Sequence, residues 1–296
     1  MNLVTPTYDP VGTCLDTAIA CFNHACDFNA VVSFDGPNIL VRSLRDIKRG
    51  EEITISYIDS TNPFAMRQAQ LKERYFFTCK CGLCQKRLDT AHDAFPSGEK
   101  DMQKIRQLEV AGFKTLEIVS KVQDPVENVK DLEGAMEFIQ STQAFPLHRQ
   151  PYAALRQQLI GAYLSTQQWV KALAHALKQY FHVDPRLFPQ EFHPLRVVHT
   201  WVLVTLMNYI RNEPHDEAMK ALARYNVNWD AVILILMKEV AQNASKSHGE
   251  SSQFAMMVRR NMEELTGGGE EVSVPPAVAQ DQWKRLRVLM VDLVPI

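Results

Sequence analysis

The sequence predicts an α+β fold in which a small β-rich N-terminal part is followed by a long helical part. Three observations carry this prediction. Residues 30–34 and 38–44 are β-prone runs joined by a turn signal. All six cysteines lie within the first 84 of 296 residues. Beyond about Thr90 the apolar residues recur at helical spacing to the end of the chain.

The N-terminal part contains three predicted strands and one predicted helix. The runs 30–34 and 38–44 are joined through Asp-Gly-Pro, which is typical of a hairpin turn. In residues 52–58 apolar and polar residues alternate after a Lys-Arg-Gly turn, so we expect a strand there. A helix over residues 63–77 opens at Pro63, a favourable first-turn position.

The helical part is punctuated by prolines. Breaks between helices are predicted at four positions where a residue is followed by proline: Asp124-Pro125, Phe145-Pro146, Asp184-Pro185 and Glu213-Pro214. Residues 155–185 have the features of one tetratricopeptide-like helical hairpin, with small, aromatic and terminating residues at Gly161, Tyr163, Ala172, Ala176 and Pro185. A second, weaker match begins 46 residues after Tyr163, so a tandem array with the usual 34-residue period is not expected.

These patterns predict four segments. Residues 1–90 form the β-rich domain with its cysteine loop, and residues 91–265 form the helical tetratricopeptide-like domain. Residues 266–279 are rich in Gly and Pro and are predicted to be a flexible linker. A last helix is expected within residues 280–296.

Charge and hydropathy exclude several classes of protein. The 32 basic and 34 acidic residues give a net charge of −2, so nucleic-acid binding driven by charge is not expected. No apolar run approaches the roughly 18 residues that a membrane helix needs. The first residues lack the basic and apolar regions of a signal peptide, so we expect a location in the nucleus, the cytoplasm or both.

The cysteines are clustered in a way that favours a metal site. Cys79, Cys81 and Cys84 place three thiols within six residues, and tetrahedral zinc needs a fourth ligand from elsewhere. Cys26 is the best candidate for that ligand and His24 is a poorer one. The alternative is that the three cysteines are buried small residues on a turn.

Three short motifs, taken together, resemble a known family. Residues 23–26 read Asn-His-Ala-Cys, residues 50–57 read Gly-Glu-Glu-Ile-Thr-Ile-Ser-Tyr, and residues 75–84 read Tyr-Phe-Phe-Thr-Cys-Lys-Cys-Gly-Leu-Cys. In this order they resemble the SET-domain protein-lysine methyltransferases, specifically the SET-and-MYND branch. The resemblance covers residues 10–90 and extends loosely over the helical part, because that branch ends in a tetratricopeptide-like domain. It implies a partial SET β-sheet domain with a post-SET zinc loop.

The resemblance also implies roles for individual residues. Asn23, His24 and Phe77 would bind S-adenosylmethionine, Tyr57 would be the active-site tyrosine, and Tyr75 would line the channel for the target lysine. Zinc would be held by four cysteines, namely Cys26, Cys79, Cys81 and Cys84. Without the motifs, the same tyrosines and Phe77 would be read as ordinary core aromatics.

This sequence departs from the family pattern in three places. Ala25 replaces the usual serine of the Asn-His motif. Only nine residues precede residue 10, where the family has a Gly-x-Gly cofactor loop, and no second cysteine-histidine cluster stands for the MYND finger. We therefore expect a fragment or a reduced protein that binds cofactor poorly and has no measurable methyltransferase activity alone.

The predicted function is transfer of a methyl group from S-adenosylmethionine to a lysine side chain of a protein, either a histone or another protein. Whether this chain is an active enzyme is left open by the missing loop. The first alternative is a noncatalytic, zinc-stabilised adaptor whose helices bind a partner protein. A nucleic-acid-binding zinc protein is a poorer alternative, because the charge is near zero and no second cysteine pair is present.

Overall fold

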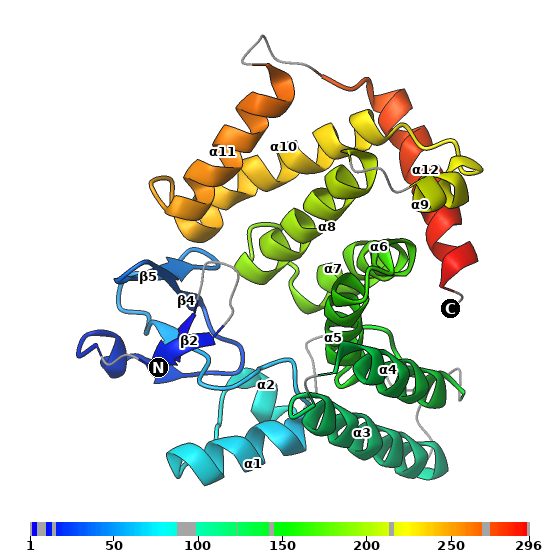
Figure 1. Cartoon of the computed structure of the whole chain (residues 1–296). Coiled ribbons are helices and arrows are strands. Elements are labelled where there is room, and N and C mark those ends of the chain that lie inside the picture. The colour runs from blue at the N-terminus through cyan, green and yellow to red at the C-terminus, as the bar shows by residue number, and fades with distance from the viewer. Residues whose placement is uncertain are drawn as a thin grey trace. The chain divides into compact units, whose positions relative to one another are not determined.

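The chain divides into two compact units by the contacts between its residues (Figure 1). The computed structural model describes most of the chain, namely residues 2–4, 10–13, 16–87, 99–122, 124–141, 145–212, 216–267 and 273–294. Unit 1 comprises Met1–Asp93, Phe188–Val198 and Val240–Glu264. Unit 2 comprises Ala94–Leu187, His199–Glu239 and Leu265–Ile296.

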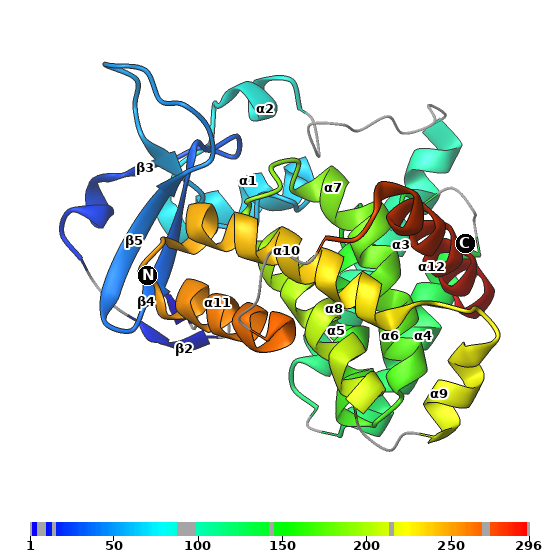
Figure 2. The same cartoon turned by 90° about the horizontal axis from the view of Figure 1, so that it is seen from above.

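The units divide at 93/94 and 264/265, close to the predicted boundaries, but two segments of the predicted helical domain, Phe188–Val198 and Val240–Glu264, group with the β-rich part. One reason is visible at the start of α11 (Gln253–Thr266). The Gln253 backbone N–H donates to Asp35 Oδ1 over 2.9 Å, so a carboxylate caps this helix. Asp35 ends β4 (Ala30–Asp35), which turns into β5 (Asn38–Ser43) beside α11 (Figures 1 and 2). A carboxylate at a helix N-terminus is favourable for both its hydrogen bond and its charge.

Among the residues that the structure describes, unit 1 contains three two-stranded sheets. The strands in chain order are β1 (Asn2–Val4), β2 (Pro10–Thr13), β3 (Asn23–His24), β4 (Ala30–Asp35), β5 (Asn38–Ser43) and β6 (Thr54–Ile55). The pairs β1–β2 and β4–β5 are antiparallel, whereas β3 and β6 are parallel. The predicted hairpin is confirmed, with Ala30 opposite Ser43 and Asp35 opposite Asn38. Gly36 in its turn has a φ of 56°, a value that glycine tolerates best.

The predicted strand over residues 52–58 is wrong in length, because only Thr54–Ile55 are in a strand. Their partner β3 has two residues, and the ladder ends with the Ala25 N–H donating to the Ile55 carbonyl over 3.1 Å. Beyond that point the Tyr57 N–H donates to a histidine ring instead of to a strand. The backbone is satisfied without further pairing.

The predicted helix over residues 63–77 is confirmed as α1 (Phe64–Tyr75), which starts directly after Pro63. It ends at Phe76, which has a left-handed φ of 60° and turns the chain toward the cysteine loop. The four-residue α2 (Gly82–Gln85) closes that loop. Leu71 of α1 is fully buried against the cysteines, so the cysteine loop packs against this helix.

Beyond residue 90 every secondary-structure element among the described residues is helical, as predicted. The helices in order are α3 (Glu99–Val119), α4 (Pro125–Gln140), α5 (Tyr152–Ser165), α6 (Trp169–Lys178), α7 (Asp184–Leu187), α8 (Pro194–Asn212), α9 (Asp216–Ala223), α10 (Trp229–His248), α11 and α12 (Pro276–Leu293). In unit 2, α3 packs on α4, α4 packs on α5, and α5 packs on α6 (Figure 1). The expected hairpin of residues 155–185 is therefore present as α5 and α6.

Of the three predicted breaks that lie within the described residues, two agree with the helices. Asp124 caps α4 by accepting from the Val126 N–H over 2.9 Å, and Phe145-Pro146 lies between α4 and α5. The break predicted at Asp184-Pro185 is wrong, since α6 continues through a π-helical turn (Gln179–Val183) into α7. A wider turn accommodates a proline that lacks an N–H. The Glu213-Pro214 step lies outside the described residues.

The predicted linker falls between α11 and α12, although residues 268–272 lie outside the described part of the chain. The predicted last helix is confirmed and begins at Pro276, earlier than the expected Gln280. Proline is favourable there because the first turn of a helix needs no partner for its N–H.

Candidate functional site: a thiol cluster beside an aromatic cluster

Four cysteine sulfurs meet in unit 1, and we call them the thiol cluster: Cys26, Cys79, Cys81 and Cys84. Cys26 follows β3, and the other three lie in the loop after α1. All four Sγ atoms lie within 4.8 Å of one another. A tetrahedral zinc ion with bonds of about 2.3 Å has sulfurs about 3.8 Å apart. The Sγ atoms of Cys84 and Cys26, at 3.5 Å, are close to that spacing, so the donor set fits zinc.

Without a bound cation, the surroundings of Cys26 favour its neutral thiol form. Burial, followed by the hydrogen bond with Cys84, raises the pKa of the Cys26 thiol well above its ordinary range. The buried Arg67 guanidinium acts in the opposite direction. A bound divalent cation favours the thiolate forms directly.

Gln68 of α1 holds the cysteine loop by its backbone. Its side-chain Oε1 accepts from the Cys79 N–H over 3.1 Å, and its Nε2 donates to the Cys79 carbonyl over 3.2 Å. The side-chain amide of Gln68 thus holds both the N–H and the carbonyl of Cys79, a member of the thiol cluster. No motif in the sequence predicted this contact, because the two residues are joined only by the way the loop folds back on the helix.

His24 connects the thiol cluster to Tyr57. Its Nδ1 accepts from the Tyr57 N–H over 3.1 Å, so the ring proton must be on Nε2. Nε2 lies 3.3 Å from Cys26 Sγ and donates to it. Burial, and then the charge of Arg67, lowers the pKa of His24 to about 4, which keeps the ring neutral. Because both ring nitrogens are engaged in this way, His24 is not the candidate for the fourth zinc ligand. It instead supports Cys26, the cysteine that is the candidate for that role.

Four rings gather at this point, and we call them the aromatic cluster: His24, Tyr57, Tyr75 and Phe77. The Tyr57 ring centroid lies 4.9 Å from that of Tyr75 and 5.4 Å from that of His24. The Phe77 centroid lies 5.9 Å from His24 and 6.4 Å from Tyr57, edge-on to the latter. The three motifs therefore meet in one place, as the resemblance requires.

The hydroxyl groups of the two tyrosines are engaged. Tyr57 donates its proton to the Phe22 carbonyl over 2.5 Å, and Tyr75 donates to the Tyr57 carbonyl over 3.2 Å. Burial, and then Tyr75, raises the pKa of Tyr57, so its hydroxyl is protonated at neutral pH. The ring of Tyr75 is 43% exposed, so one side of the aromatic cluster is open to solvent.

Asn23 lies at the edge of the aromatic cluster. Its backbone pairs with Thr54 across the parallel ladder, and its exposed side-chain amide donates to Glu52 Oε1 over 2.6 Å. The structure thus brings together the four rings and the four thiols predicted for the site, whereas the Asn23 side chain contacts Glu52. Their individual roles in cofactor binding and catalysis stay predictions.

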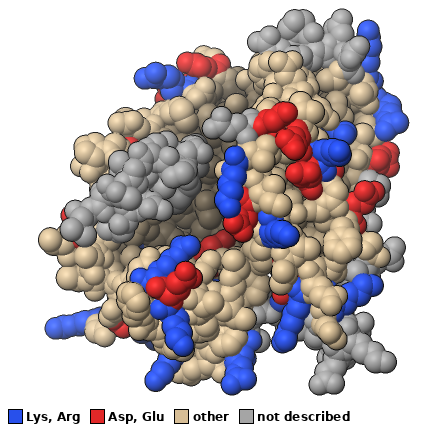
Figure 3. All heavy atoms as spheres, turned by 60° about the horizontal axis from the view of Figure 1, so that its bottom comes forward, with Lys and Arg blue, Asp and Glu red and all other residues tan. Residues whose placement is uncertain are grey.

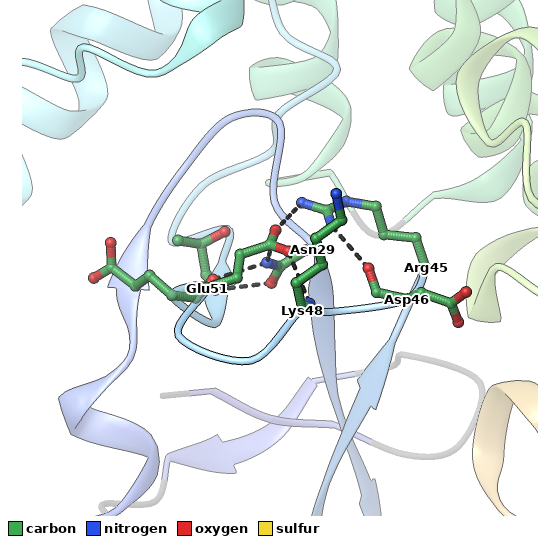
Figure 4. Close-up of polar contacts among 7 residues, drawn as sticks. Asn29, Arg45, Asp46, Lys48 and Glu51 are labelled. Atoms are coloured by element: carbon green, nitrogen blue, oxygen red, sulfur yellow. Dashed lines mark hydrogen bonds and ion pairs between the residues drawn. The ribbon is translucent and has the colours of Figure 1, made fainter.

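Behind Asn23 the structure contains a polar network that the sequence did not predict (Figure 4). The buried Asn29 side chain donates to the Glu52 carbonyl over 2.8 Å and accepts from the Thr54 N–H over 2.9 Å. Glu51 forms an ion pair with Arg45 and accepts from the Lys48 N–H over 3.0 Å. The Arg45 ion pair lowers the pKa of Glu51 to about 2. The network therefore holds the Gly-Glu-Glu segment in place beneath β3.

Two surface properties complete the description. The face in Figure 3 carries Lys and Arg side chains as well as Asp and Glu side chains. Among the described residues, no helix combines the length and the apolar character that spanning a bilayer requires.

Comparison with known families identifies the N-terminal part. The SET-domain family matches residues 4–58, which include the Asn-His motif, the β4–β5 hairpin and the Gly-Glu-Glu segment up to Tyr57. The match shows that the chain contains a SET domain. The resemblance found in the motifs is confirmed over this range.

Several curated proteins are similar to parts of the chain. The chain is 48% identical over 85 residues to the SET domain and MYND-type zinc finger protein 6 of Schizosaccharomyces pombe, covering 29% of this chain and 18% of that protein. It is 44% identical over 75 residues to the human histone-lysine N-methyltransferase SMYD3, covering 25% of this chain and 18% of that protein. It is 26% identical over 269 residues to chicken N-lysine methyltransferase SMYD2, covering 86% of this chain and 55% of that protein. The chain is thus similar to proteins of the SET-and-MYND branch and spans at most about half the length of these relatives.

Proposed function

We propose that this chain carries the methyl-transfer site of a protein-lysine N-methyltransferase that uses S-adenosylmethionine. The observation that carries the proposal is the meeting of Tyr57, Tyr75, Phe77 and His24 in one aromatic cluster beside the thiol cluster. Two relatives named as lysine methyltransferases are similar to this chain, one over 75 residues and the other over 269 residues.

Asn23, His24 and Phe77 are proposed to form one side of the cofactor site. When bound, S-adenosylmethionine supplies a methyl group on a positively charged sulfur. Aromatic rings attract a cation held against their faces, and Phe77 offers such a face beside His24. The exposed amide of Asn23 offers hydrogen bonds to polar groups of the ligand. The Asn29 and Glu51 network holds the backbone beneath Asn23.

Tyr57 is proposed to orient the amine of the target lysine. Because its proton is donated to the Phe22 carbonyl, the lone pairs of its oxygen remain free to accept from an amine N–H or a methyl C–H. Tyr75 adds a second aromatic wall, and burial between such walls favours a lysine amine that has lost its proton to solvent. That neutral nitrogen can form the bond to the methyl carbon while the carbon–sulfur bond breaks and its electron pair stays on sulfur.

The thiol cluster is proposed to hold zinc. When bound, zinc supplies a rigid link between Cys26 and the loop from Cys79 to Cys84. Phe77 lies two residues before Cys79, and His24 lies two residues before Cys26. Fixing the two cysteines therefore fixes both rings of the proposed cofactor side.

Calorimetric titration of the zinc-loaded chain with S-adenosylhomocysteine tests the proposal. We expect weak but measurable binding that is lost in Phe77→Ala, while the zinc content of that variant is unchanged. No heat of binding in the wild-type chain would instead favour the zinc-stabilised adaptor with a tetratricopeptide-like helical domain.

Methyl transfer is measured separately, with radiolabelled S-adenosylmethionine and both histone and non-histone proteins. We predict little or no transfer by this chain alone. Any transfer that does occur should disappear in Tyr57→Phe, because the oxygen that accepts from the amine is removed. A substrate of either kind and a nuclear or cytoplasmic location remain predictions.

A further inference from the structure

The last turn of α1 and the cysteine loop after it are strongly basic. Residues 72–87 contain five exposed cations, which we call the basic rim: Lys72, Arg74, Lys80, Lys86 and Arg87. The same stretch contains one acidic residue, Glu73, so its formal net charge is +4. Because the whole chain has a net charge of −2, the remaining residues together carry −6. A local charge of the opposite sign indicates a surface for a negatively charged partner.

The cations of the basic rim are not used to hold the fold together. In the described part of the chain none of the five forms an ion pair, whereas Arg45, for example, pairs with Glu51. Lys72 and Arg74 lie in the last turn of α1, where the helix dipole favours a positive charge. The other three lie outside the helices and have no such reason for their charge.

The fold gathers the basic rim at one corner of unit 1. Leu71, directly before Lys72, packs in one buried cluster with three cysteines of the thiol cluster. Gln85 at the end of α2 donates from Nε2 to the Lys80 carbonyl over 2.9 Å. The end of α1, the cysteine loop and α2 therefore form one compact body. Like charges on such a body add up in the field that a partner meets.

Opposing negative charge at this corner is limited. Asp27 Oδ2 lies close to Gly82 at the start of α2, and Glu73 is exposed on α1. The thiolates of a metal-loaded thiol cluster would lie beneath the surface, because three of its members are at most 6% exposed. Two carboxylates are thus outnumbered by the five exposed cations.

Phe76 adds an exposed aromatic ring to the same corner. It is 89% exposed, more than any other exposed large hydrophobic side chain among the described residues, and its φ of 60° is unusual for a bulky residue. Burial in the core therefore does not account for a phenylalanine at this position. In the chain, Arg74 and Phe76 flank Tyr75, which is 43% exposed and is the proposed wall of the lysine channel. Arginine and aromatic side chains are the types that binding interfaces favour.

On the basis of the proposed methyl-transfer function, we propose that the basic rim and Phe76 bind an acidic segment of the protein substrate beside its target lysine. The lysine enters next to Tyr75, and Asp or Glu residues a few positions away in the substrate meet the basic rim. A target lysine within a basic sequence is disfavoured by the same charges. A nucleic acid fits less well, because the charge of −6 on the rest of the chain repels a long polyanion.

Fluorescence anisotropy with the zinc-loaded full chain tests this inference. Two labelled peptides of equal length carry one central lysine, flanked either by Asp and Glu or by Ser and Gly. We expect the acidic peptide to bind roughly tenfold more tightly, and the difference to shrink as the salt concentration rises. Lys72→Glu combined with Lys86→Glu should remove the preference. Lys104→Glu combined with Lys130→Glu changes two exposed lysines of α3 and α4 by the same charge and should keep it. Phe76→Ala should weaken the binding of both peptides.

Equal affinities of the wild type for the two peptides, or an equal loss of preference in the two double variants, would overturn the proposal. An oligonucleotide that binds more tightly than the acidic peptide at the same salt concentration would also overturn it and assign the surface to nucleic acid. If the variant of the basic rim fails to fold, the peptide preference of the wild type and its salt dependence still decide.

Titration with S-adenosylhomocysteine separates this inference from the proposed function. Cofactor binding without a preference for the acidic peptide would remove the docking surface alone. A preference for the acidic peptide without cofactor binding would support the docking surface and count against the methyl-transfer site.

Discussion

Nε2 of His24 donates to Sγ of Cys26 across 3.3 Å, so a single imidazole joins the thiol cluster to the aromatic cluster. The opposite nitrogen of the same ring accepts from the Tyr57 N–H. A donor to a thiolate sulfur stabilises the charge that the sulfur carries when it binds a metal. The ring therefore couples metal binding to the position of the proposed active-site tyrosine.

Replacing His24 with alanine should weaken zinc binding by roughly 10–100-fold, the usual effect of removing a residue that supports a metal ligand. The variant loses the hydrogen bond to Cys26 but keeps all four thiols. Competition with a chromophoric chelator measures the affinity. Asn23→Ala is the control, since its side chain contacts Glu52 and no cysteine. Equal affinities in the His24 variant and the wild type would disprove the coupling.

Cys84→Ser should abolish stoichiometric zinc binding, because three thiolates and a hydroxyl make a much poorer tetrahedral set than four thiolates. Elemental analysis of the purified protein measures the metal. Cys21→Ser is the matched control, as Cys21 is exposed and outside the thiol cluster. Retention of one zinc per chain by the Cys84 variant would refute the assignment.

The sequence predicted those parts of the fold that have a local signature. The β4–β5 hairpin follows from β-prone runs around an Asp-Gly step, and α1 follows from helical spacing after Pro63. The thiol cluster was predicted from the dense spacing of Cys79, Cys81 and Cys84. The sequence also indicates Cys26 as its fourth member, and the four sulfurs lie together in the structure.

What the sequence could not predict are contacts between single polar groups far apart in the chain. Asn29 bonds to residues 23 to 25 positions away, and Asp35 caps a helix 218 positions away. Such contacts have no periodicity and depend on where the backbone already lies. For the same reason, the grouping of Val240–Glu264 with the SET domain was not foreseen.

Glu51 should make the protein more stable near neutral pH than in acid. Its pKa is about 2 in the folded protein against an ordinary value of 4.5, so the folded state favours the ionised form. This contribution is fully present above about pH 5 and is lost as the pH falls toward 2. Glu51→Gln should therefore lower Tm at pH 6 more than at pH 3.

Thermal unfolding between pH 6 and 3 measures this difference. Glu52→Gln changes a neighbouring exposed glutamate, whose contact is a single hydrogen bond from Asn23. It should reduce Tm less, and with little dependence on pH. A Glu51→Gln effect that is the same at pH 6 and pH 3 would contradict the prediction.

Replacing Asn29 with alanine should cost about 2–4 kcal/mol of unfolding free energy, because the Glu52 carbonyl and the Thr54 N–H lose their partner in a buried place. Urea denaturation measures the change. Asn38→Ala, at the exposed start of β5, should stay within about 0.5 kcal/mol of the wild type. Similar values for the two variants would show that the Asn29 network contributes little.

Gln68 and Gln70 allow a comparison within α1. Gln68→Leu removes both hydrogen bonds to the Cys79 backbone, so zinc should dissociate faster, by roughly tenfold for a loss of about 1.4 kcal/mol. Gln70 has a buried Oε1 with no hydrogen-bond partner among the described residues, so Gln70→Leu should leave stability unchanged or raise it. Stopped-flow release of zinc to a chelator gives the rate. Both variants replace a glutamine of α1 with leucine. Faster zinc release in Gln68→Leu but not in Gln70→Leu would therefore be due to the lost hydrogen bonds to Cys79. Equal rates would mean that the thiolates and the metal hold the loop without it.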